Sequence, residues 1–476
     1  MARTAYSVEQ LVELFSPALS SSQILIDPQS HIPFLKEWRG RFHGKTVAVL
    51  CPESTEQVAD CVKIAADYNI GLVPQGGNTG LVGGQIPDST GTELILSCHK
   101  LNHISDFSSE NKSITVQAGV VLEQLHDFLQ DTPWMFPVRL ASEGSAQIGG
   151  LISTNAGGVS VIKYGNMRDN VIGVQAILAN GTIIDDIHTL YKYNKGFAPS
   201  QLFIGTEGIH GIITKASLRL CPRPQTTICF VMRYQNIDDV LSSFHYLTQK
   251  FPDDIGQFEL IPQFGLWLLQ QHKPEIHLPF TDMPEWCCLC EINSAYPQDM
   301  VQALLHPALE YLYRENIIQD VVIAQNQQQA QTFHKMRMVM SECQKYQGAS
   351  LKHDISFPIS ELAKAIPAII KDITAYLPEI RPMPFGHIGD GNLHFNFSKP
   401  IAMDDAEFMS HEDAINQLVF AQVQKFKGSF SAEHGIGQLR RGALKNYLSP
   451  ACYDLLYGLK QHLDPQKILN HGKMFL

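Results

Sequence analysis

The chain has 476 residues, which is too long for a single hydrophobic core and predicts two or three domains. With 44% hydrophobic and 17% charged residues, its composition is that of an ordinary globular protein. The formal net charge of -11 argues against binding to nucleic acid or to an anionic membrane surface. An anionic substrate would therefore have to be captured by a local cluster of basic side chains.

The cysteines and the N-terminus give an expectation about the cellular compartment. Ten cysteines occur, and the one stretch with CxxC spacing, Cys287-Cys288-Leu289-Cys290, lies in the apolar run 286–292 and is typical of a buried strand. The first residues contain neither an apolar stretch nor an Arg/Ser-rich transit sequence. Free thiols suit a reducing compartment, so the sequence predicts a cytoplasmic location. Because no run of about 18 apolar residues occurs, no membrane span is expected.

The N-terminal half begins with a β-α-β pattern that ends in a glycine-rich loop. A strand at 46–51 and a capping sequence at 54–57 precede an amphipathic helix, and a second strand runs into QGGNTGLVGG at 75–84. The five glycines among residues 76–84 can expose consecutive backbone N–H groups as a cradle for a phosphate. The spacing is not GxGxxG and no helix is predicted after the loop, so a Rossmann dinucleotide site is a poor match. A tight surface turn is the alternative.

Two further glycine-rich regions follow in the same half of the chain. After strands at 93–97 and 113–119 and a helix near 121–130, the sequence reads EGSAQIGG at 143–150 and TNAGG at 154–158. A hairpin over 171–185, with a type I′ turn at Asn180-Gly181, then leads to GTEGIHG at 205–211. A single phosphate needs only one such region. Three therefore predict an extended cofactor threaded between two subdomains.

These three motifs, in this order, resemble the FAD-binding domain of the vanillyl-alcohol-oxidase (PCMH) type. The resemblance covers about residues 40–222 and implies that the first loop wraps the pyrophosphate while the later regions line the ribose and isoalloxazine. Members with covalently bound FAD carry a histidine in the first loop, and this loop has none, so non-covalent FAD is implied. The implied cofactor-binding residues are Pro74, Gln75, Gly76, Gly77, Asn78, Thr79, Gly80, Gly83, Gly144, Ser145, Gly149, Gly150, Thr154, Asn155, Gly158, Glu207, Gly211, Ile212 and Asn470.

A domain boundary is predicted at Cys221–Pro224, where two prolines break the pattern. Beyond it strands and helices alternate, which predicts an α+β domain whose sheet is covered mainly on one face. The predicted fold class is thus α+β. It comprises an FAD-binding domain of two subdomains at 1–222, a substrate- and metal-binding cap domain with an antiparallel sheet at 223–425, and a helical C-terminal segment at 426–476 that returns to the FAD domain.

The sequence PFGHIGDGNLHFNF at 384–397 is the strongest candidate for a site. Asp390-Gly391 between two alternating segments predicts a two-residue hairpin turn that places His387 opposite His394. Opposed residues on antiparallel strands have Cβ atoms about 4.5–5.5 Å apart, a spacing that suits two imidazoles on one metal ion. Asn396 then shares the polar face, and the intervening apolar residues face the core. Two hydrogen-bonded histidines without a metal are the alternative.

A second part of the site is predicted at SAEHGIG, residues 431–437. Neighbouring residues on a strand point to opposite faces, but the glycines here predict a bend that lets Glu433 and His434 reach one pocket. Glu433 and the two hairpin histidines would complete a His₂Glu metal set with open positions, as catalytic sites require. For the dipeptide alone, an exposed Glu-His pair is the alternative.

The motifs GHIGDGNLHFN at 386–396, SAEHGIG at 431–437 and LDPQKILN at 463–470 carry a second resemblance. They are similar to the branch of FAD-linked 2-hydroxy-acid dehydrogenases typified by D-2-hydroxyglutarate dehydrogenase, with D-lactate and glycolate enzymes as relatives. The resemblance implies that His434 is the catalytic base. It implies Zn²⁺ or another divalent transition metal on His387, His394 and Glu433, and substrate binding by Arg337, Ser341, Lys352, Asn396 and His434.

The chain departs from this branch at four positions. His334, Met338 and His471 stand where the branch tends to have tryptophan, glutamate and proline, and Ser341 stands where threonine is usual. These positions lie near the expected substrate carboxylate and flavin. The departures therefore bear on the identity of the substrate more than on the type of reaction.

The implied residues can oxidise a 2-hydroxy acid. The metal would polarise the hydroxyl group, His434 would accept its proton, and the C2 hydride would go to N5 of FAD. Arg337 and Lys352 would bind carboxylates, and two cations plus a metal suit a dianion better than lactate. The preferred reaction is D-2-hydroxyglutarate to 2-oxoglutarate, with D-lactate, D-malate and glycolate as alternatives. Taken alone, Arg337 and Lys352 would be read as surface ion-pairing residues.

Two other classes of function are left open by the sequence. A flavin-free zinc hydrolase would leave the glycine regions unexplained, and a non-catalytic flavin- or metal-binding module would leave the base beside the metal set unexplained. The sequence does not identify the electron acceptor. No iron–sulfur cysteine pattern occurs, so electrons are expected to leave to a separate electron-transfer flavoprotein, quinone or dye. An acceptor other than NAD or oxygen is expected. A homodimer is left open.

Overall fold

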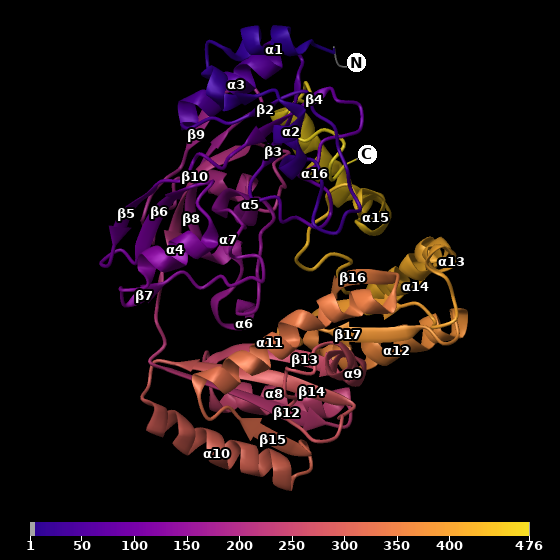
Figure 1. Ribbon diagram of the computed structural model, residues 1–476. Coiled ribbons are helices and arrows are strands. Elements are labelled where there is room, and N and C mark those ends of the chain that lie inside the picture. The colour runs from indigo at the N-terminus through magenta and orange to yellow at the C-terminus, as the bar shows by residue number, and fades with distance from the viewer. Residues whose placement is uncertain (1–4, 476) are drawn as a thin grey trace. The chain divides into compact units, whose positions relative to one another are not determined.

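The computed structural model describes residues 5–475, which divide into two compact units. Unit 1 comprises the chain up to residue 158 together with 165–222 and the residues from 433 onward, and unit 2 comprises 159–164 and 223–432. Each unit combines helices with sheets (Figure 1), which confirms the predicted α+β class. The ten cysteines are free thiols, as predicted. No helix in the described part of the chain is both long and apolar enough to cross a bilayer.

Unit 1 is built around two main sheets. The first has the strand order β1-β2-β4-β3, in which only β1 is antiparallel to its neighbour, and the second is antiparallel with the order β5-β6-β10-β8-β9. The strands of the first sheet are β1 (Ile24–Leu25), β2 (Val49–Leu50), β3 (Gly71–Gln75) and β4 (Glu93–Ser97). Those of the second are β5 (Ile104–Ser108), β6 (Ser113–Gln117), β8 (Val171–Ile177), β9 (Ile183–Asp185) and β10 (Ile212–Arg219), and β7 (Trp134–Met135) pairs separately with β11 (Cys221–Pro222).

Local sequence signals explain several elements of unit 1. Ser54 accepts a hydrogen bond from the backbone N–H of Gln57 and so caps α3, whose apolar residues at helical spacing enter the core. The predicted hairpin is formed by β8 and β9. The predicted type I′ turn at Asn180-Gly181 is wrong, because a type I′ turn needs a positive φ at both residues and only Gly181 has one, at 80°. The helices are α1 (Val8–Phe15), α2 (Pro28–His31), α3 (Thr55–Asp67), α4 (Leu122–Leu129), α5 (Ile148–Ser153), α7 (Met167–Asn170), α15 (Arg441–Tyr447) and α16 (Pro450–Leu463).

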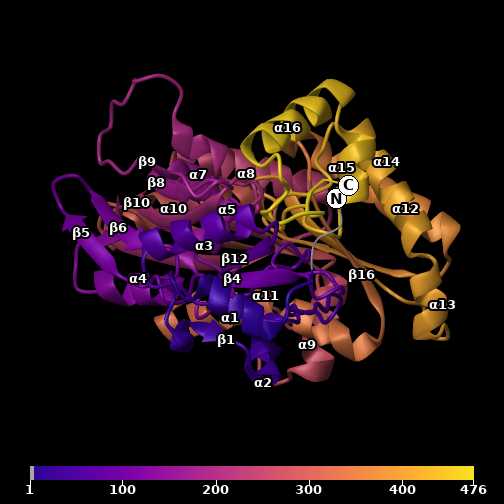
Figure 2. The same ribbon diagram turned by 90° about the horizontal axis from the view of Figure 1, so that it is seen from above.

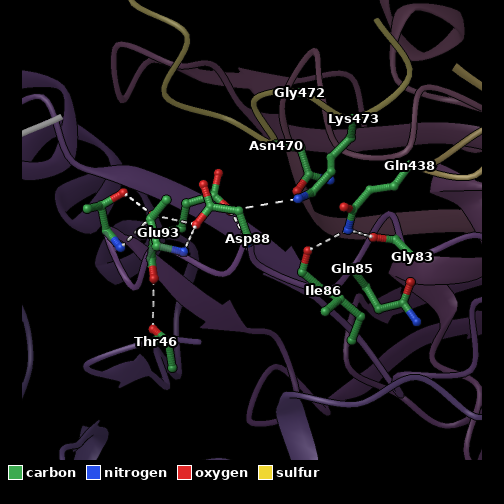
Figure 3. A network of polar contacts seen from close by, with 12 residues as sticks. Thr46, Gly83, Gln85, Ile86, Asp88, Glu93, Gln438, Asn470, Gly472 and Lys473 are labelled. Atoms are coloured by element: carbon green, nitrogen blue, oxygen red, sulfur yellow. Dashed lines mark hydrogen bonds and ion pairs between the residues drawn. The ribbon is translucent and has the colours of Figure 1, made fainter. Parts of the chain in front are cut away.

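The last residues of the chain are bound to the first sheet of unit 1 (Figure 3). Lys473 Nζ lies 3.7 Å from Glu93 Oε2 in β4, and only 2% and 1% of these two side chains are exposed. Gln438 donates through Nε2 to the carbonyl oxygens of Gly83 at 2.7 Å and Ile86 at 3.2 Å. These bonds attach the C-terminal segment to the glycine-rich loop that follows β3.

The larger sheet of unit 2 is antiparallel, with the order β13-β14-β12-β15. One face packs against α8 and α10 and the other against α9 and α11, so the prediction that helices cover mainly one face was wrong. No helix was predicted at α9, because its apolar residues are mainly consecutive and do not follow helical spacing. The elements are β12 (Thr226–Tyr234), β13 (Ile255–Pro262), β14 (Trp286–Ser294), β15 (Asp320–Ile323), α8 (Ile237–Lys250), α9 (Gln263–His272), α10 (Gln298–Arg314) and α11 (Gln327–Cys343).

The smaller sheet of unit 2 is antiparallel, with the order β16-β18-β17. The face that carries Leu393, Phe395 and Phe397 is buried against α12 and α14, which run side by side in Figure 2. The opposite face carries polar side chains. The elements are β16 (Ser350–Ser356), β17 (Arg381–Phe385), β18 (Asn392–Ser398), α12 (Leu362–Tyr376), α13 (Asp405–Ser410) and α14 (Glu412–Lys425).

Candidate functional site

The hairpin that carries the two histidines has a different register from the predicted one. β17 and β18 pair Phe385, and not His387, with His394. The connection between the strands spans residues 386–391 and is longer than the predicted two-residue turn. The predicted two-residue turn would need a positive φ at both Asp390 and Gly391, and only Gly391 has one, at 88°.

The longer connection arises because β13 competes for its backbone. Gly386 leaves β17 and forms an antiparallel bridge with Leu260, whose N–H donates to the Gly386 carbonyl at 2.8 Å. The loop then carries His387 toward β13, where its Nε2 lies 3.3 Å from Oε1 of Glu259. The rings of His387 and His394 are still neighbours, with centroids 5.8 Å apart.

The polar face of the smaller sheet in unit 2 is organised by strand register. Lys352 of β16 lies opposite Asn396 of β18, and Asp354 lies opposite His394. Residues two apart on a strand share a face, so these four residues lie on one side of the sheet. The register therefore brings together three predicted site residues and adds Asp354, a buried carboxylate in the strand that supplies Lys352. Asn396 is buried and donates through Nδ2 to Gln344 at 2.8 Å.

Helix α11 supplies two further predicted residues beside this face. Lys352 Nζ donates to the hydroxyl of Ser341 at 3.3 Å. The Arg337 guanidinium carbon lies 4.7 Å from the centroid of Phe385, the residue opposite His394. Arg337, Ser341 and Lys352 therefore gather at one place, and such a set of cations and a hydroxyl can bind an anion.

Glu259, a buried glutamate absent from the predicted site, organises these basic residues. Its side chain is fully buried; Oε2 accepts a hydrogen bond from Arg337 Nε at 2.5 Å, and Oε1 lies 3.3 Å from His387. Burial alone would raise the pKa of Glu259, but the charges of Arg337 and His387 outweigh it and lower the pKa. An ionised carboxylate that binds Nε fixes the guanidinium plane without using its two terminal nitrogens. The feature of the sequence that could have identified Glu259 is its position as a single carboxylate inside the apolar run 255–262.

A second carboxylate fixes the same helix. His334 Nε2 lies 2.9 Å from Oε2 of Glu291 in β14. Burial would raise the pKa of Glu291, but the hydrogen bond and charge of His334 lower it. Helix α11 is thus held to the larger sheet by two ion pairs, which it forms through His334 and, three residues later, through Arg337. His334, one of the departures from the family pattern, makes the more exposed of the two.

The glycine regions of unit 1 line one groove of about 710 Å³, a volume in the usual range for a small-molecule site. We call it the glycine-lined groove. It is bordered by residues from the end of β3 and the start of β10. The predicted cofactor residues that line it are Pro74, Gln75, Gly76, Gly77, Asn78, Thr79, Gly80, Ser145, Gly149, Gly150, Thr154, Glu207, Gly211, Ile212 and Asn470. Outside its lining lie Gly83, Gly144, Asn155 and Gly158.

Three buried side-chain oxygens in the groove wall test its fit to a polar cofactor. Oε1 of Gln75, Oε1 of Gln147 and Oδ1 of Asn470 have no hydrogen-bond partner among residues 5–475. A buried unsatisfied polar atom costs about 1–3 kcal/mol, and such atoms are rare in folded proteins. The hydroxyl and N–H donors of FAD could satisfy these oxygens, so the residues present fit this cofactor.

Two glycines of the groove wall give a prediction about cofactor binding. A Cβ at Gly77 would overlap the carbonyl oxygen of Ser145, whereas a Cβ at Gly150 would meet nothing within 4 Å. Gly150→Ala should therefore leave the free energy of unfolding unchanged or raised by about 1 kcal/mol, because alanine is favoured in a helix. It should weaken FAD binding about tenfold, the equivalent of 1.4 kcal/mol, because its methyl group enters the groove.

The measurement is a fluorescence titration of the apoprotein with FAD, combined with urea unfolding. Gly77→Ala is the matched comparison and should lower stability and FAD affinity together, since the two loops touch at this glycine. Wild-type FAD affinity in Gly150→Ala would show that the groove does not hold the cofactor at this point.

The bend predicted at residues 431–437 is present, and the part of it that carries Glu433 and His434 belongs to unit 1. Buried Glu207 accepts hydrogen bonds from the backbone N–H groups of Ile436 at 2.6 Å and Gly437 at 2.8 Å. Burial raises the pKa of Glu207, although both N–H groups and Arg440 act in the opposite direction. Glu433 and His434 line the glycine-lined groove, with Glu433 Oε1 3.6 Å from His434 Nε2. The proposed base is therefore part of the groove wall.

The predicted metal ligands are divided between the two units, with His387 and His394 in unit 2 and Glu433 in unit 1. Imidazole and carboxylate are among the usual donors to zinc and related divalent metals, so the donor chemistry fits. Asp354, opposite His394, is a further carboxylate, and it accepts the N–H of Ala432, the residue directly before Glu433, at 3.2 Å. The three-ligand set itself stays a prediction.

Two family models match the chain. An FAD binding domain matches residues 46–186, and the C-terminal domain of FAD linked oxidases matches residues 223–474. D-2-hydroxyglutarate dehydrogenase of Stutzerimonas stutzeri is 34% identical, over 98% of this chain and 98% of that protein. The mitochondrial D-2-hydroxyglutarate dehydrogenase of Danio rerio is 31% identical, over 96% and 84%. A putative mitochondrial D-lactate dehydrogenase of Schizosaccharomyces pombe is 32% identical, over 97% and 89%.

Solved structures with the same fold are found at low sequence identity. p-Cresol methylhydroxylase with bound substrate has a TM-score of 0.76 at 17% identity, covering 99% of this chain and 98% of that one. 4-Ethylphenol oxidase from Gulosibacter chungangensis has a TM-score of 0.74 at 17% identity, covering 100% and 99%. These likenesses confirm the predicted fold of the vanillyl-alcohol-oxidase type.

Proposed function

Because the chain belongs to the family of FAD-linked oxidases, we propose that it oxidises a D-2-hydroxy acid, with D-2-hydroxyglutarate as the preferred substrate and 2-oxoglutarate as the product. Similarity over the full chain to D-2-hydroxyglutarate dehydrogenases is the observation that carries this proposal. D-Lactate, D-malate and glycolate are the alternative substrates within the same reaction type.

The polar face in unit 2 supports a substrate with two carboxylates. Arg337, held through Nε by Glu259, presents a fixed guanidinium plane, and Lys352 adds a second positive charge beside Ser341. A planar guanidinium can bind one carboxylate through two hydrogen bonds, and an ammonium can bind a second as a point charge. A monocarboxylate such as lactate would use only part of this charge.

The groove in unit 1 supports the redox half of the proposal. FAD, bound non-covalently there, supplies N5 as the hydride acceptor. A divalent metal on His387, His394 and Glu433 supplies positive charge at the substrate hydroxyl. His434 accepts the hydroxyl proton, since imidazole titrates near neutral pH and a positioned base assists proton removal. Glu433 lies beside this imidazole, with its Oε1 3.6 Å from Nε2 of His434.

Several expectations from the sequence remain part of the proposal. The electron acceptor is a separate flavoprotein or quinone, the location is cytoplasmic, and a homodimer is left open. Some of the relatives are named as mitochondrial proteins. The proposed division is an FAD-binding domain at 1–222, a cap domain at 223–425 and a C-terminal segment at 426–476.

The proposal is tested by anaerobic mixing of the FAD- and zinc-loaded protein with single 2-hydroxy acids while the flavin absorbance is followed. D-2-hydroxyglutarate and D-malate should bleach the flavin at least about tenfold faster than D-lactate or glycolate, because the smaller acids have no second carboxylate for the ammonium of Lys352 to bind. L-2-hydroxyglutarate is the control. Bleaching by D-lactate alone would overturn the substrate, and bleaching by none of the acids would overturn the reaction. A colourless protein with hydrolase activity would favour the zinc hydrolase.

A further inference from the structure

A short segment that interrupts unit 1 belongs to unit 2. Residues 159–164, which we call the strap, pack with unit 2, while the chain on both sides of them belongs to unit 1. The strap contains α6 (Val161–Tyr164) and is flanked by Gly158 and Gly165, whose φ values are 93° and 70°. Gly157, two residues before the strap, lines the glycine-lined groove. One continuous stretch of chain therefore first lines the groove, at Gly157, and then packs in unit 2, at residues 159–164.

Lys163 attaches the strap to the ends of two strands. Its Nζ donates to the carbonyl oxygens of Asp253 at 2.6 Å and Asn293 at 2.6 Å, and to Oδ1 of Asp254 at 3.0 Å. Asp254 directly precedes β13, and Asn293 lies near the end of β14. These three partners use all three donors of the ammonium group. Only 16% of the side chain is exposed, so this is a built-in attachment and not a solvated surface ion pair.

Ile162 contacts the loop that carries His387. A Cβ built on Gly389 would overlap Cδ1 of Ile162 and would lie 3.0 Å from Cε2 of Phe244, so the loop backbone rests directly on these side chains. The N–H of Gly389 donates to the carbonyl of Phe258 in β13 at 3.3 Å. The loop is therefore held from one side by β13 and packed by the strap two residues after His387.

We propose that the strap is a positioning element of the active site. Through Ile162 and Lys163 it holds the 386–391 loop and strand β13, and with them His387 and Glu259. This inference rests on the proposed function, in which His387 binds the metal. The two strap side chains touch neither substrate nor cofactor in this account and act only through the groups that they hold in place.

Hydrogen exchange on the full-length, FAD-loaded and metal-free protein tests the positioning directly. In Ile162→Ala and Lys163→Met, amides of residues 386–391 should exchange about tenfold faster, because local opening becomes easier without global unfolding. Amides of β16 and β18 should be unchanged, and Ile162→Leu, which keeps δ-carbons at this position, should stay within about twofold of the wild type. Ile401→Ala is the matched control, since this isoleucine of unit 2 is 81% exposed. Unchanged exchange in the loop, or a uniform increase across unit 2, would overturn the proposal.

Zinc affinity gives a second readout that does not depend on turnover. Groups that support a metal ligand typically change metal affinity by about 10–100-fold when removed. Competition with a chromophoric chelator should therefore show weaker zinc binding in Ile162→Ala and near-normal binding in Ile162→Leu. If the loop loosens but no 2-hydroxy acid reduces the flavin, the proposed function fails and the positioning of the loop stands. If flavin reduction occurs while loop exchange and zinc affinity are unaffected, the strap proposal fails alone.

Discussion

Replacement of His434 by alanine is expected to slow flavin reduction by D-2-hydroxyglutarate by about 10²–10⁴-fold, the usual contribution of a positioned general base. His434 lies in the wall of the glycine-lined groove, and its ring is 3.6 Å from the carboxylate of Glu433. Its loss leaves the hydroxyl proton without a nearby acceptor. The flavin content should stay near that of the wild type, because most of the groove wall consists of other residues. Anaerobic stopped-flow absorbance measures the rate.

His462→Ala is the matched control, because this histidine belongs to the same C-terminal part of unit 1 and is exposed. It should reduce its flavin at the wild-type rate. A His434→Ala protein that does the same would remove the assignment of His434 as the base.

The second large effect is expected for Glu259→Gln. Removing one partner of a buried ion pair typically costs about 3–5 kcal/mol, and this change leaves the guanidinium of Arg337 buried beside a neutral amide. The free energy of unfolding should fall by about that amount. The KM for D-2-hydroxyglutarate should rise at least about tenfold, because Arg337 loses the bond that fixes its plane. Urea unfolding and initial rates measure the two effects.

Glu291→Gln is the comparison for this variant. Glu291 pairs with His334 on the same helix, but His334 has no proposed contact with substrate, and 31% of its side chain is exposed. Glu291→Gln should therefore raise the KM for D-2-hydroxyglutarate less than Glu259→Gln does. Equal KM values for the two variants would mean that Glu259 supports the helix and does not orient Arg337.

The sequence predicted correctly those features of the fold that are determined by residues close together in the chain. The strand at 93–97 is present with the predicted bounds, and the bend at 431–437 follows from its glycines. The glycine-rich regions indicated the cofactor-binding fold because each loop exposes its own backbone N–H groups, which requires no knowledge of distant contacts. Arg337, Ser341 and Lys352 were grouped by the family resemblance alone, since the two cations taken by themselves would be read as surface ion-pairing residues.

Features that depend on distant partners could not be read from the sequence. The register at His394 was wrong because Gly386 bridges to Leu260, a strand residue far away in the chain. Glu259 was missed because Arg337, the cation that makes its burial tolerable, is 78 residues away. Nothing in the composition of residues 159–164 indicates that they pack with unit 2. In each case the determining contact is a tertiary one.

Removal and restoration of the metal tests the central claim most directly. Protein treated with a chelator should keep its FAD but lose rapid bleaching by D-2-hydroxyglutarate, and stoichiometric zinc should restore it. The same zinc should fail to restore His387→Ala, His394→Ala or Glu433→Gln. Chelated, metal-free protein that is bleached at the rate of the untreated protein would contradict the account.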